Sequence, residues 1–369
     1  MSRKKGLAIG DKGGVIRASG RSVSLKSLAE HLGLSPTTVS LVLNGSPLAS
    51  SIPQTTKDRI FAAAQALNYR PNFVARSLRA QRSYTLGILV PELSDGYSAM
   101  VLCGVEDYLL SRGFFYFVAS HRHKAELIDK YPHMLLDRSV EGLIAVDTPV
   151  RYLASLPVVA VSRHDDLEGV TNIVLNHTRA AALALDYLTH HGHRNIAFIK
   201  GQVFSSDTEV RWKDIRDAAR KLGLVIRPSL VAQLEGDSPS PELGYIAARR
   251  LLSSGESFTA LFAFNDISAI GAIRALQEDG LRVPEDVSVV GFDDVYAAAF
   301  HNPALTTIRQ PLWQMGKLAA ETLLMRIANG PNAPYPKVLT VEPELVVRQS
   351  TAKAPAGKGS GTRVGRRAI

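Results

Sequence analysis

The segment "SVSLKSLAEHLGLSPTTVSLVLNG" (residues 22–45) decides the fold of the N-terminal part of the chain. Apolar residues at the i, i+3, i+4, i+7 spacing of an amphipathic helix follow Ser24, a residue type that caps helices: Leu25, Leu28, Ala29 and Leu32. Gly33 comes next and can take the left-handed conformation that ends a helix. Ser35 then caps a second helix with Pro36 at its first position. Two short helices around a glycine turn predict a helix-turn-helix, whose second helix enters the DNA major groove.

The next segment and the charge of this region support the same interpretation. Residues 55–69 show a third amphipathic pattern, with Ile60, Ala63, Ala64 and Leu67 on one face. Three short helices are also typical of packing units that bind no DNA. However, residues 1–82 contain thirteen Lys and Arg against three Asp and Glu, while residues 83–351 have a net charge of −6. A basic module on an acidic body favours a polyanion such as DNA as its partner.

The rest of the chain alternates between two patterns. Apolar runs of strand length predict buried parallel strands at residues 85–91, 114–120, 140–147, 156–162, 195–200, 260–266 and 287–294. Helical patterns lie between them, at residues 98–112, 177–191, 211–222, 241–253 and 267–279 among others. This alternation predicts open parallel sheets with helices on their faces, and about 265 residues are too many for one such sheet. The sequence therefore predicts an α/β body with two lobes.

Composition argues against several other classes of protein. The sequence contains no run of about 18 apolar residues, so no transmembrane helix is predicted. The N-terminus lacks the long apolar region of a secretory signal, and the single cysteine, Cys103, fits a reducing cytoplasm. No enzyme motif with a nucleophile or a phosphate-binding loop occurs. The histidines of "HRH" (121–123) and "HHGHRN" (190–195) are adjacent in sequence, and such ligands rarely converge on one ion. No metal and no cofactor is expected.

Three stretches resemble, in order and spacing, the lactose and galactose repressor family. They are "SPTTVSLVLN" (35–44), "LNYRPNFVARSLR" (67–79), and "GFDD" (291–294) followed by "PALTTIRQP" (303–311). The resemblance implies a two-lobed body like that of periplasmic sugar-binding proteins, with the chain crossing between the lobes near residues 175, 305 and 338. The expected regions are a disordered basic tail (1–21), a helix-turn-helix domain (22–70), a hinge (71–82), an effector-binding and dimerisation domain (83–350) and a second disordered basic tail (351–369).

The resemblance also implies which residues contact DNA. In that family the segment after the third helix is a hinge that becomes helical when two subunits meet on an operator. Residues 72–79 would form this helix, and Leu78 would enter the minor groove, where an apolar wedge can replace base stacking. The alternative is that Leu78 packs on the body. The expected DNA-binding residues are Ser35, Pro36, Thr37, Thr38, Ser40, Leu41, Asn44, Asn72, Arg76, Leu78 and Arg79.

The sequence departs from several members of that family at two places. Leu41 stands where a polar or basic residue often contacts bases. A leucine can touch a thymine methyl group but makes no bidentate hydrogen bond, so the operator sequence cannot be carried over. The segment "GSPLASSIPQT" (45–55) is longer than in the best-known members, which leaves the loop between the second and third helices open.

Polar side chains follow several of the expected strands, where ligands of open sheets bind. Carboxylate, amide and guanidinium groups can bind paired sugar hydroxyls, and an aromatic ring can stack on a sugar face. The expected effector-binding residues are Asp95, Tyr97, Ser162, Arg211, Asn265 and Asp293. The resemblance implies effector contacts first for Arg211, Asn265 and Asp293. Some sugar-binding relatives carry an acidic residue where Ser162 stands, so the effector is not assigned to a known sugar.

Structural roles remain as alternatives for some of these residues and their neighbours. Asp266 or Asn265 can cap the helix that follows, Asp294 can stabilise its loop, and Arg211 can form a structural ion pair.

The sequence thus predicts a cytoplasmic, homodimeric transcriptional regulator, most simply a repressor, that binds a palindromic double-stranded operator and a small-molecule effector, expected to be a carbohydrate. A solute-binding protein of the same fold is one alternative, but it would need an export signal and no helix-turn-helix. An enzyme of the two-lobed type is another, but it would need a nucleophile or metal constellation. The sequence leaves open the effector, induction against corepression, the operator, and dimer against tetramer.

Overall fold

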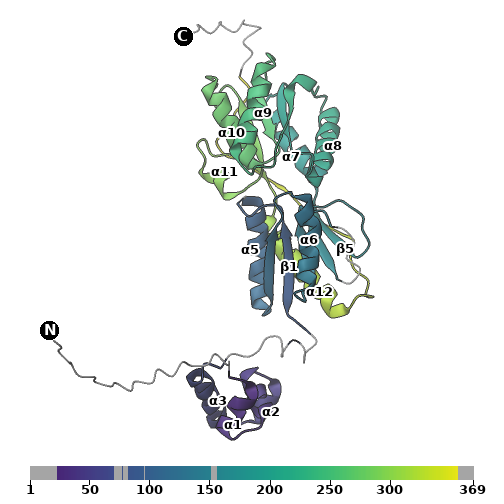
Figure 1. Ribbon diagram of the computed structural model, residues 1–369. Coiled ribbons are helices and arrows are strands. Elements are labelled where there is room, and N and C mark those ends of the chain that lie inside the picture. The colour runs from purple at the N-terminus through teal and green to yellow at the C-terminus, as the bar shows by residue number, and fades with distance from the viewer. Residues whose placement is uncertain (1–22, 70–76, 78–81, 95, 151–155, 356–369) are drawn as a thin grey trace, which may run out of the picture. The chain divides into compact units, whose positions relative to one another are not determined.

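The computed structural model describes residues 23–69, 77, 82–94, 96–150 and 156–355 (Figure 1). The chain forms two compact units, residues 1–82 and residues 83–369. Five of the predicted contact residues lie outside the described part of the chain: Asn72, Arg76, Leu78, Arg79 and Asp95. The predicted hinge helix at 72–79 therefore stays a prediction.

The first unit contains the predicted helix-turn-helix. Helices α1 (Leu25–Leu32) and α2 (Pro36–Leu43) begin where the side chains of Ser24 and Ser35 each accept a hydrogen bond from a backbone N–H of the first turn. Gly33 ends α1 with a φ of 65°, a left-handed conformation that glycine adopts without a Cβ clash. The local sequence signals therefore place both helix starts and the turn correctly.

A third helix, α3 (Gln54–Ala66), completes a small bundle around Leu28, Val39 and Ile60, which are fully buried. The loop that the sequence left open contains a short 3-10 helix, η1 (Pro47–Ser51), whose Ala49 is also buried in this core. The long loop is thus part of the packed unit.

The second unit has the two predicted lobes, each built on a six-stranded sheet (Figure 1). In the N lobe the strands lie in the order β11-β5-β4-β3-β1-β2: β11 (Val338–Val341), β5 (Val170–Leu175), β4 (Val158–Val161), β3 (Leu143–Val146), β1 (Thr85–Val90) and β2 (Phe115–Ser120). In the C lobe the order is β12-β10-β9-β8-β6-β7: β12 (Glu344–Val346), β10 (Thr306–Arg309), β9 (Ser288–Asp293), β8 (Ala260–Ala263), β6 (Ile196–Lys200) and β7 (Val231–Gln233). All pairs are parallel except β10 with β12.

Helices cover both faces of each sheet and bury its apolar residues. Helices α5 (Gly96–Ser111) and α12 (Leu312–Asn329) pack on one face of the N-lobe sheet, and α6 (Ala125–Leu136) packs on the other. In the C lobe, one face is covered by α9 (Pro241–Ser253) and α10 (Asp266–Glu278), and the other by α7 (His177–His190) and α8 (Ser206–Lys221). Short helices α11 (Tyr296–Phe300) and η2 (Pro228–Leu230) complete the C lobe. Among the described residues, no helix combines the length and apolar character needed to cross a membrane.

The chain passes between the lobes three times. It leaves the N lobe after β5 at residue 176, returns at residues 310–311 between β10 and α12, and crosses again at residues 342–343 between β11 and β12. Sequence reasoning placed these crossings near 175, 305 and 338. It also expected α8 to begin at residue 211, but the helix begins at Ser206, one and a half turns earlier.

In each lobe, one pair of helices meets through glycine. A Cβ atom on Gly104 of α5 would lie 1.9 Å from the backbone oxygen of Trp313, and one on Gly316 of α12 would lie 1.9 Å from the backbone oxygen of Val101. In the C lobe, Gly271 of α10 has the same kind of contact with the backbone of α9. These helix pairs approach so closely that no side chain fits between their backbones.

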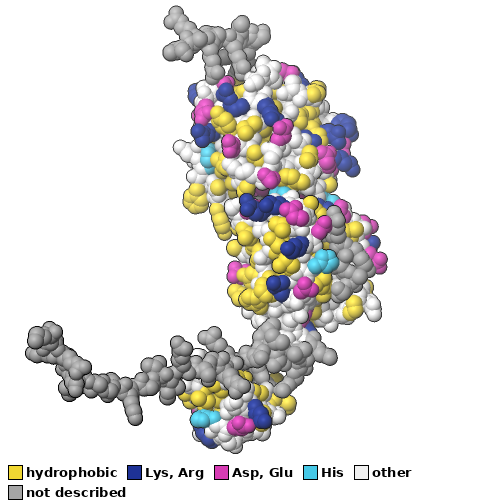
Figure 2. All heavy atoms as spheres, in the orientation of Figure 1, with side chains coloured by type: hydrophobic (Ala, Val, Ile, Leu, Met, Phe, Trp, Pro, Cys, Tyr) yellow, Lys and Arg dark blue, Asp and Glu magenta, His cyan; other side chains and the backbone are white. Residues whose placement is uncertain are grey.

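The outer surface of the second unit has mixed charge. On the face shown in Figure 2, acidic and basic side chains are interspersed over both lobes, with hydrophobic side chains between them. No large field of a single sign dominates this face, which fits the small negative net charge of residues 83–351.

Candidate ligand cleft and nucleic-acid interface

A cleft lies between the two lobes, at the carboxyl ends of their strands. About 860 Å³ of space there is not filled by protein atoms, and part of it is open to solvent. Both lobes line it, as expected for open parallel sheets. Four of the predicted effector-binding residues lie on its wall: Tyr97, Arg211, Asn265 and Asp293. The polar and aromatic side chains that line the cleft suit a small organic ligand.

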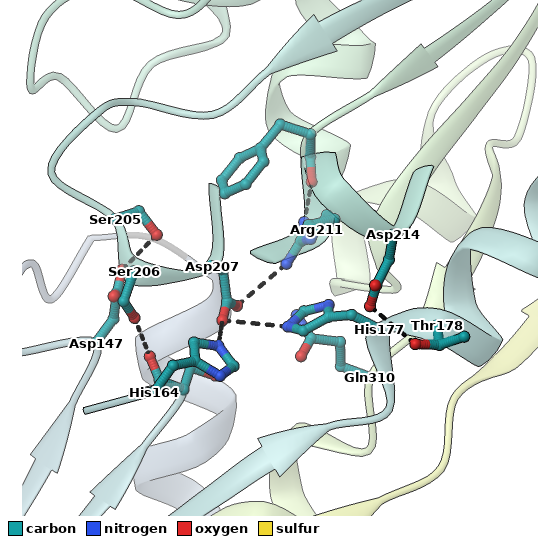
Figure 3. Close-up of polar contacts among 12 residues, drawn as sticks. Asp147, His164, His177, Thr178, Ser205, Ser206, Asp207, Arg211, Asp214 and Gln310 are labelled. Atoms are coloured by element: carbon teal, nitrogen blue, oxygen red, sulfur yellow. Dashed lines mark hydrogen bonds and ion pairs between the residues drawn. The ribbon is translucent and has the colours of Figure 1, made fainter. Parts of the chain in front are cut away.

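Arg211 lies in the C-lobe wall and is only 4% exposed. Its guanidinium carbon lies 3.6 Å from the ring centroid of Phe292 and 4.4 Å from that of Phe264. The guanidinium donates one hydrogen bond to the backbone oxygen of Phe264 and another to Asp207, at 3.2 Å (Figure 3). The predicted cleft position and the alternative of an ion pair therefore both apply to this residue.

Asp207, which sequence reasoning missed, is a centre of polar contacts in the cleft wall. Its Oδ1 lies 2.8 Å from Nε2 of His164 and 3.2 Å from Nε2 of His177, while Arg211 binds its other oxygen (Figure 3). Burial acts to raise the pKa of Asp207, but His177, His164 and Arg211 together hold this pKa well below its usual range. Asp207 is therefore an ionised carboxylate at neutral pH.

The same three groups meet the spacing requirement of a metal site. Donor atoms of His164, His177 and Asp207 lie within 4.8 Å of one another. However, both Nε2 atoms point at one carboxylate oxygen at hydrogen-bond distance, and a guanidinium occupies the other. Hydrogen bonding accounts for this arrangement without a metal ion.

Asn265 and Asp266 are the two residues that the sequence allowed as caps of α10. Asn265 caps α10, since its side-chain oxygen accepts from Ser268 N–H at 2.9 Å, and it also lines the cleft. Asp266 is fully buried and accepts hydrogen bonds from the Thr307 hydroxyl and from Val295 N–H. The capping alternative for Asp266 is therefore wrong. Because the cap uses the oxygen of Asn265, its amide nitrogen is the group left for a ligand.

Asp293 and Asp294 face different surroundings, although they are neighbours in sequence. Asp293 is buried in the cleft wall and accepts a hydrogen bond from Gln310 at 2.6 Å. Burial raises the pKa of Asp293 well above its usual range, although Arg211 opposes the rise. Asp294 instead pairs with Arg309 and Arg348. This agrees with the structural alternative for Asp294.

Tyr97 and Ser162 contact each other at the N-lobe side of the cleft. The Tyr97 hydroxyl lies 2.5 Å from the Ser162 hydroxyl, and Tyr97 lines the cleft while Ser162 lies behind it. Asp147, another residue that sequence reasoning missed, lines the cleft at the end of β3. Burial raises the pKa of Asp147 to about 8, and the Asp207 carboxylate adds to this rise.

Four consecutive C-lobe residues, 204–207, contact the N lobe. The Ser205 hydroxyl donates to Asp147 at 3.2 Å, and the Ser206 hydroxyl donates to the backbone oxygen of Ser162 at 2.6 Å (Figure 3). The Asp207 contact with His164 is also between lobes. The ring centroids of Phe204 and His123 lie 4.0 Å apart. The start of α8 thus carries both the ligand-facing Arg211 and most of the contacts across this part of the cleft.

Helix α2 presents the predicted base-reading residues in the first unit. Pro36 and Thr37 are exposed, and Leu41 is half-buried against the bundle core. Two predicted contact residues already use their side chains within the helix: the Ser35 hydroxyl caps α2, and Asn44 donates to the backbone oxygen of Ser40 at 2.8 Å. Short exposed side chains leave the helix surface free to approach a groove closely.

Comparison with known proteins agrees with this architecture. Residues 24–72 match the model of bacterial regulatory proteins, lacI family, and residues 185–351 match that of a periplasmic binding protein-like domain. The chain is 32% identical over 336 residues to the HTH-type transcriptional repressor PurR of Pasteurella multocida (strain Pm70), which covers 89% of this chain and 98% of the relative.

Solved structures have a similar fold. The Lac repressor dimer bound to operator and the anti-inducer ONPF superposes with a TM-score of 0.79 at 26% identity, covering 90% of this chain and 100% of that one. The complex of the transcriptional regulator CelR with cellobiose superposes with a TM-score of 0.65 at 28% identity, covering 89% and 99%.

Proposed function

Because the chain belongs to the lacI family of bacterial regulatory proteins and is a DNA-binding transcriptional repressor with an effector-binding domain, we propose that a sugar or sugar-like effector in the interlobe cleft controls its affinity for a palindromic operator. The observation that carries the proposal is the cleft wall itself. A guanidinium, a carboxamide and carboxyl groups converge there with aromatic rings, the combination that binds paired hydroxyls and an apolar sugar face.

The effector class has further support from a relative. CelR, which has a similar fold and 28% identity, was solved with cellobiose. In this chain we assign the effector contacts to Arg211, Asn265, Asp293 and Tyr97, with Ser162 holding the Tyr97 hydroxyl. Asp95 follows β1 in sequence and belongs to the same proposal.

We propose that the repressor acts in the cytoplasm as a homodimer on a palindromic site. The Lac repressor structure, a dimer on its operator, supports this assembly. One α2 helix from each subunit would read one half-site, with Pro36, Thr37, Thr38 and Leu41 at the base edges and Ser35, Ser40 and Asn44 nearer the phosphates. Asn72, Arg76, Leu78 and Arg79 would contact the minor groove and phosphates through the hinge.

Selection of DNA fragments by the purified full-length protein tests the proposal. We expect a palindromic sequence to be enriched, and its affinity to fall steeply with salt because several phosphates are contacted. Adding sugars singly to the bound complex should then change the affinity for at least one of them. Absence of sequence-specific binding, with or without added metabolites, would leave the alternative of a solute-binding protein of the same fold.

A further inference from the structure

The ionisable groups of the cleft are mostly acidic. Among the described residues, five carboxyl groups line it: Glu92, Asp147, Asp207, Asp237 and Asp293. Against them stand one guanidinium, Arg211, and one imidazole, His123. Burial lowers the pKa of His123, so this ring is neutral at pH 7. Arg211 is therefore the one cationic group that the described wall presents to a ligand.

The charge of Arg211 is already matched inside the protein. Asp207, one helical turn earlier on α8, holds the guanidinium at 3.2 Å, and both side chains are about 95% buried. The ring faces of Phe292 and Phe264 and the backbone oxygen of Phe264 cover much of the rest of the guanidinium. Arg211 can still donate a hydrogen bond to a ligand hydroxyl, but it offers no unmatched positive charge.

The ion pair of Asp207 with Arg211 is not easily broken. His164 and His177 bind the carboxylate oxygen that Arg211 leaves free, so the side chain is held from three directions. A ligand phosphate or carboxylate would have to displace Asp207 from Arg211 or remain buried beside several carboxyl groups without a counter-charge. Burying an unpaired charge is strongly unfavourable.

We propose that the effector carries no net negative charge, and that Asp207 is the residue that makes the cleft discriminate against anionic ligands. The inference rests on the proposed function and narrows it. The cleft accepts uncharged or amine-bearing polyhydroxyl compounds, such as free sugars and amino sugars, and discriminates against their phosphorylated or carboxylated counterparts.

Matched ligands test the selection in the wild-type, full-length protein. Each set contains one sugar in its free, 2-amino and phosphorylated forms, such as glucose, glucosamine and glucose 6-phosphate, and ribose with ribose 5-phosphate extends the series. Affinities are measured by calorimetry at pH 7.5. We expect the phosphorylated member of any set that binds to have an affinity at least tenfold lower than the free sugar. A phosphorylated member that binds more tightly than its free sugar would overturn the inference.

The variant Asp207→Asn tests the role of the residue. Asparagine keeps the shape but removes the charge, so Arg211 becomes available to an anion, and the affinity ratio of free to phosphorylated sugar should fall at least fivefold. Asp217→Asn is the matched control, because Asp217 lies on the same helix, is partly exposed, and pairs with Arg220 outside the cleft. Its ratio should equal that of the wild type. An unchanged ratio in a folded Asp207→Asn protein would overturn the assignment to Asp207.

Two further outcomes separate this inference from the proposed function. If Asp207→Asn shows no cooperative thermal unfolding, the ligand series on the wild-type protein still decides whether anions are excluded. If the protein binds its operator but no member of any set, the sugar-like effector class is wrong and the charge selection falls with it. Preference for a phosphorylated sugar overturns the charge selection alone.

Discussion

Carboxyl groups that line the cleft have different charge states. Asp207 is ionised because two imidazoles and a guanidinium surround it, whereas burial raises the pKa values of Asp147 and Asp293. The Asp207 charge itself contributes to the rise at Asp147. Burial acts to raise the pKa of all three carboxyl groups, and of the three only Asp207 has partners enough to offset it, namely His177, His164 and Arg211.

Asp147→Asn should stabilise the protein at pH 8 and have little effect near pH 4. The pKa of Asp147 is about 8 in the folded protein, above its ordinary value, so the unfolded chain releases this proton first and stability falls as the pH rises between the two values. Asparagine has no proton to release, so the stability of the variant does not fall with pH for this reason. We expect its melting temperature to exceed that of the wild type by a few degrees at pH 8, at roughly 2–4 °C per kcal/mol.

The pH series itself contains the control for this prediction. Asp217→Asn, a change at a partly exposed position outside the cleft, should show no trend across the same range. A difference between Asp147→Asn and the wild type that does not vary with pH would contradict the raised pKa.

Leu78→Ala should weaken binding to the specific operator by about tenfold or more, while binding to random DNA stays unchanged. The apolar wedge acts only where the duplex is kinked, whereas phosphate contacts do not depend on sequence. Gel-shift titrations on both DNAs measure the two affinities. Leu222→Ala removes a partly exposed leucine at the end of α8 and serves as control. Equal losses on both DNAs would favour packing of Leu78 on the body instead.

Residue types at strand ends, and for Arg211 a helix start and the family resemblance, allowed part of the cleft to be predicted. Tyr97, Arg211, Asn265 and Asp293 line it, as expected from the sequence. Asp147 also ends a predicted strand, and the same rule applied there would have found it. Asp207 could not be found in this way, because its importance comes from two histidines that lie 43 and 30 residues away in sequence.

At the scale of elements, apolar runs predicted seven of the twelve strands that the structure describes, and the other five were missed. Helices α9 and α10 agree with their predicted ranges within one residue. Strands β7, β10, β11 and β12 were missed because they have only three or four residues and too few positions to show a period. Strand β5 has six residues and was also missed, since Thr171 and Asn172 interrupt its apolar run. Helix α6 was not predicted, because it contains Pro132 and proline disfavours the interior of a helix. The start of α8 was missed because its first turn is polar, and this hid the helical position of Asp207.

Gly316→Ala should destabilise the N lobe by several kcal/mol. The added Cβ would lie 1.9 Å from a backbone oxygen of α5, and since backbone cannot rotate away, the two helices must separate. Gly271→Ala should have the same effect in the C lobe, where the added atom would lie 1.8 Å from the backbone oxygen of Pro241.

Chemical denaturation of the full-length variants measures these losses. Glu321→Ala, at an exposed position of α12, should change stability by less than about 0.5 kcal/mol. If Gly316→Ala is no less stable than Glu321→Ala, the close approach of α5 and α12 is not as described.

At the scale of the whole molecule, the contacts of residues 204–207 connect ligand binding to the relative position of the lobes. Ser206→Ala removes one hydrogen bond between lobes, from the Ser206 hydroxyl to the Ser162 backbone oxygen. We expect the ratio of operator affinities with and without saturating effector to move toward one, by a factor of about 2–10, because a single hydrogen bond contributes roughly 0.5–1.5 kcal/mol.

Ser111→Ala provides the control for this coupling, since among the described residues the Ser111 hydroxyl bonds within its own helix, to the backbone oxygen of Tyr108. Its affinity ratio should match that of the wild type. A Ser206→Ala protein with wild-type coupling would show that this hydrogen bond does not take part in the response.

The three connections at residues 176, 310–311 and 342–343 limit which relative motions of the lobes a ligand can cause. Glycine contacts join one pair of helices in each lobe, so we expect each lobe to move largely as one body, with the three connections favouring a hinge rotation between the lobes. The angle of closure between the lobes is then the quantity through which a bound ligand would act on the DNA-binding unit. Ligands of different chemistry that close the lobes to the same angle should have the same effect on operator affinity. A ligand that closes them only partway should change the operator affinity by an intermediate amount, as a partial agonist does.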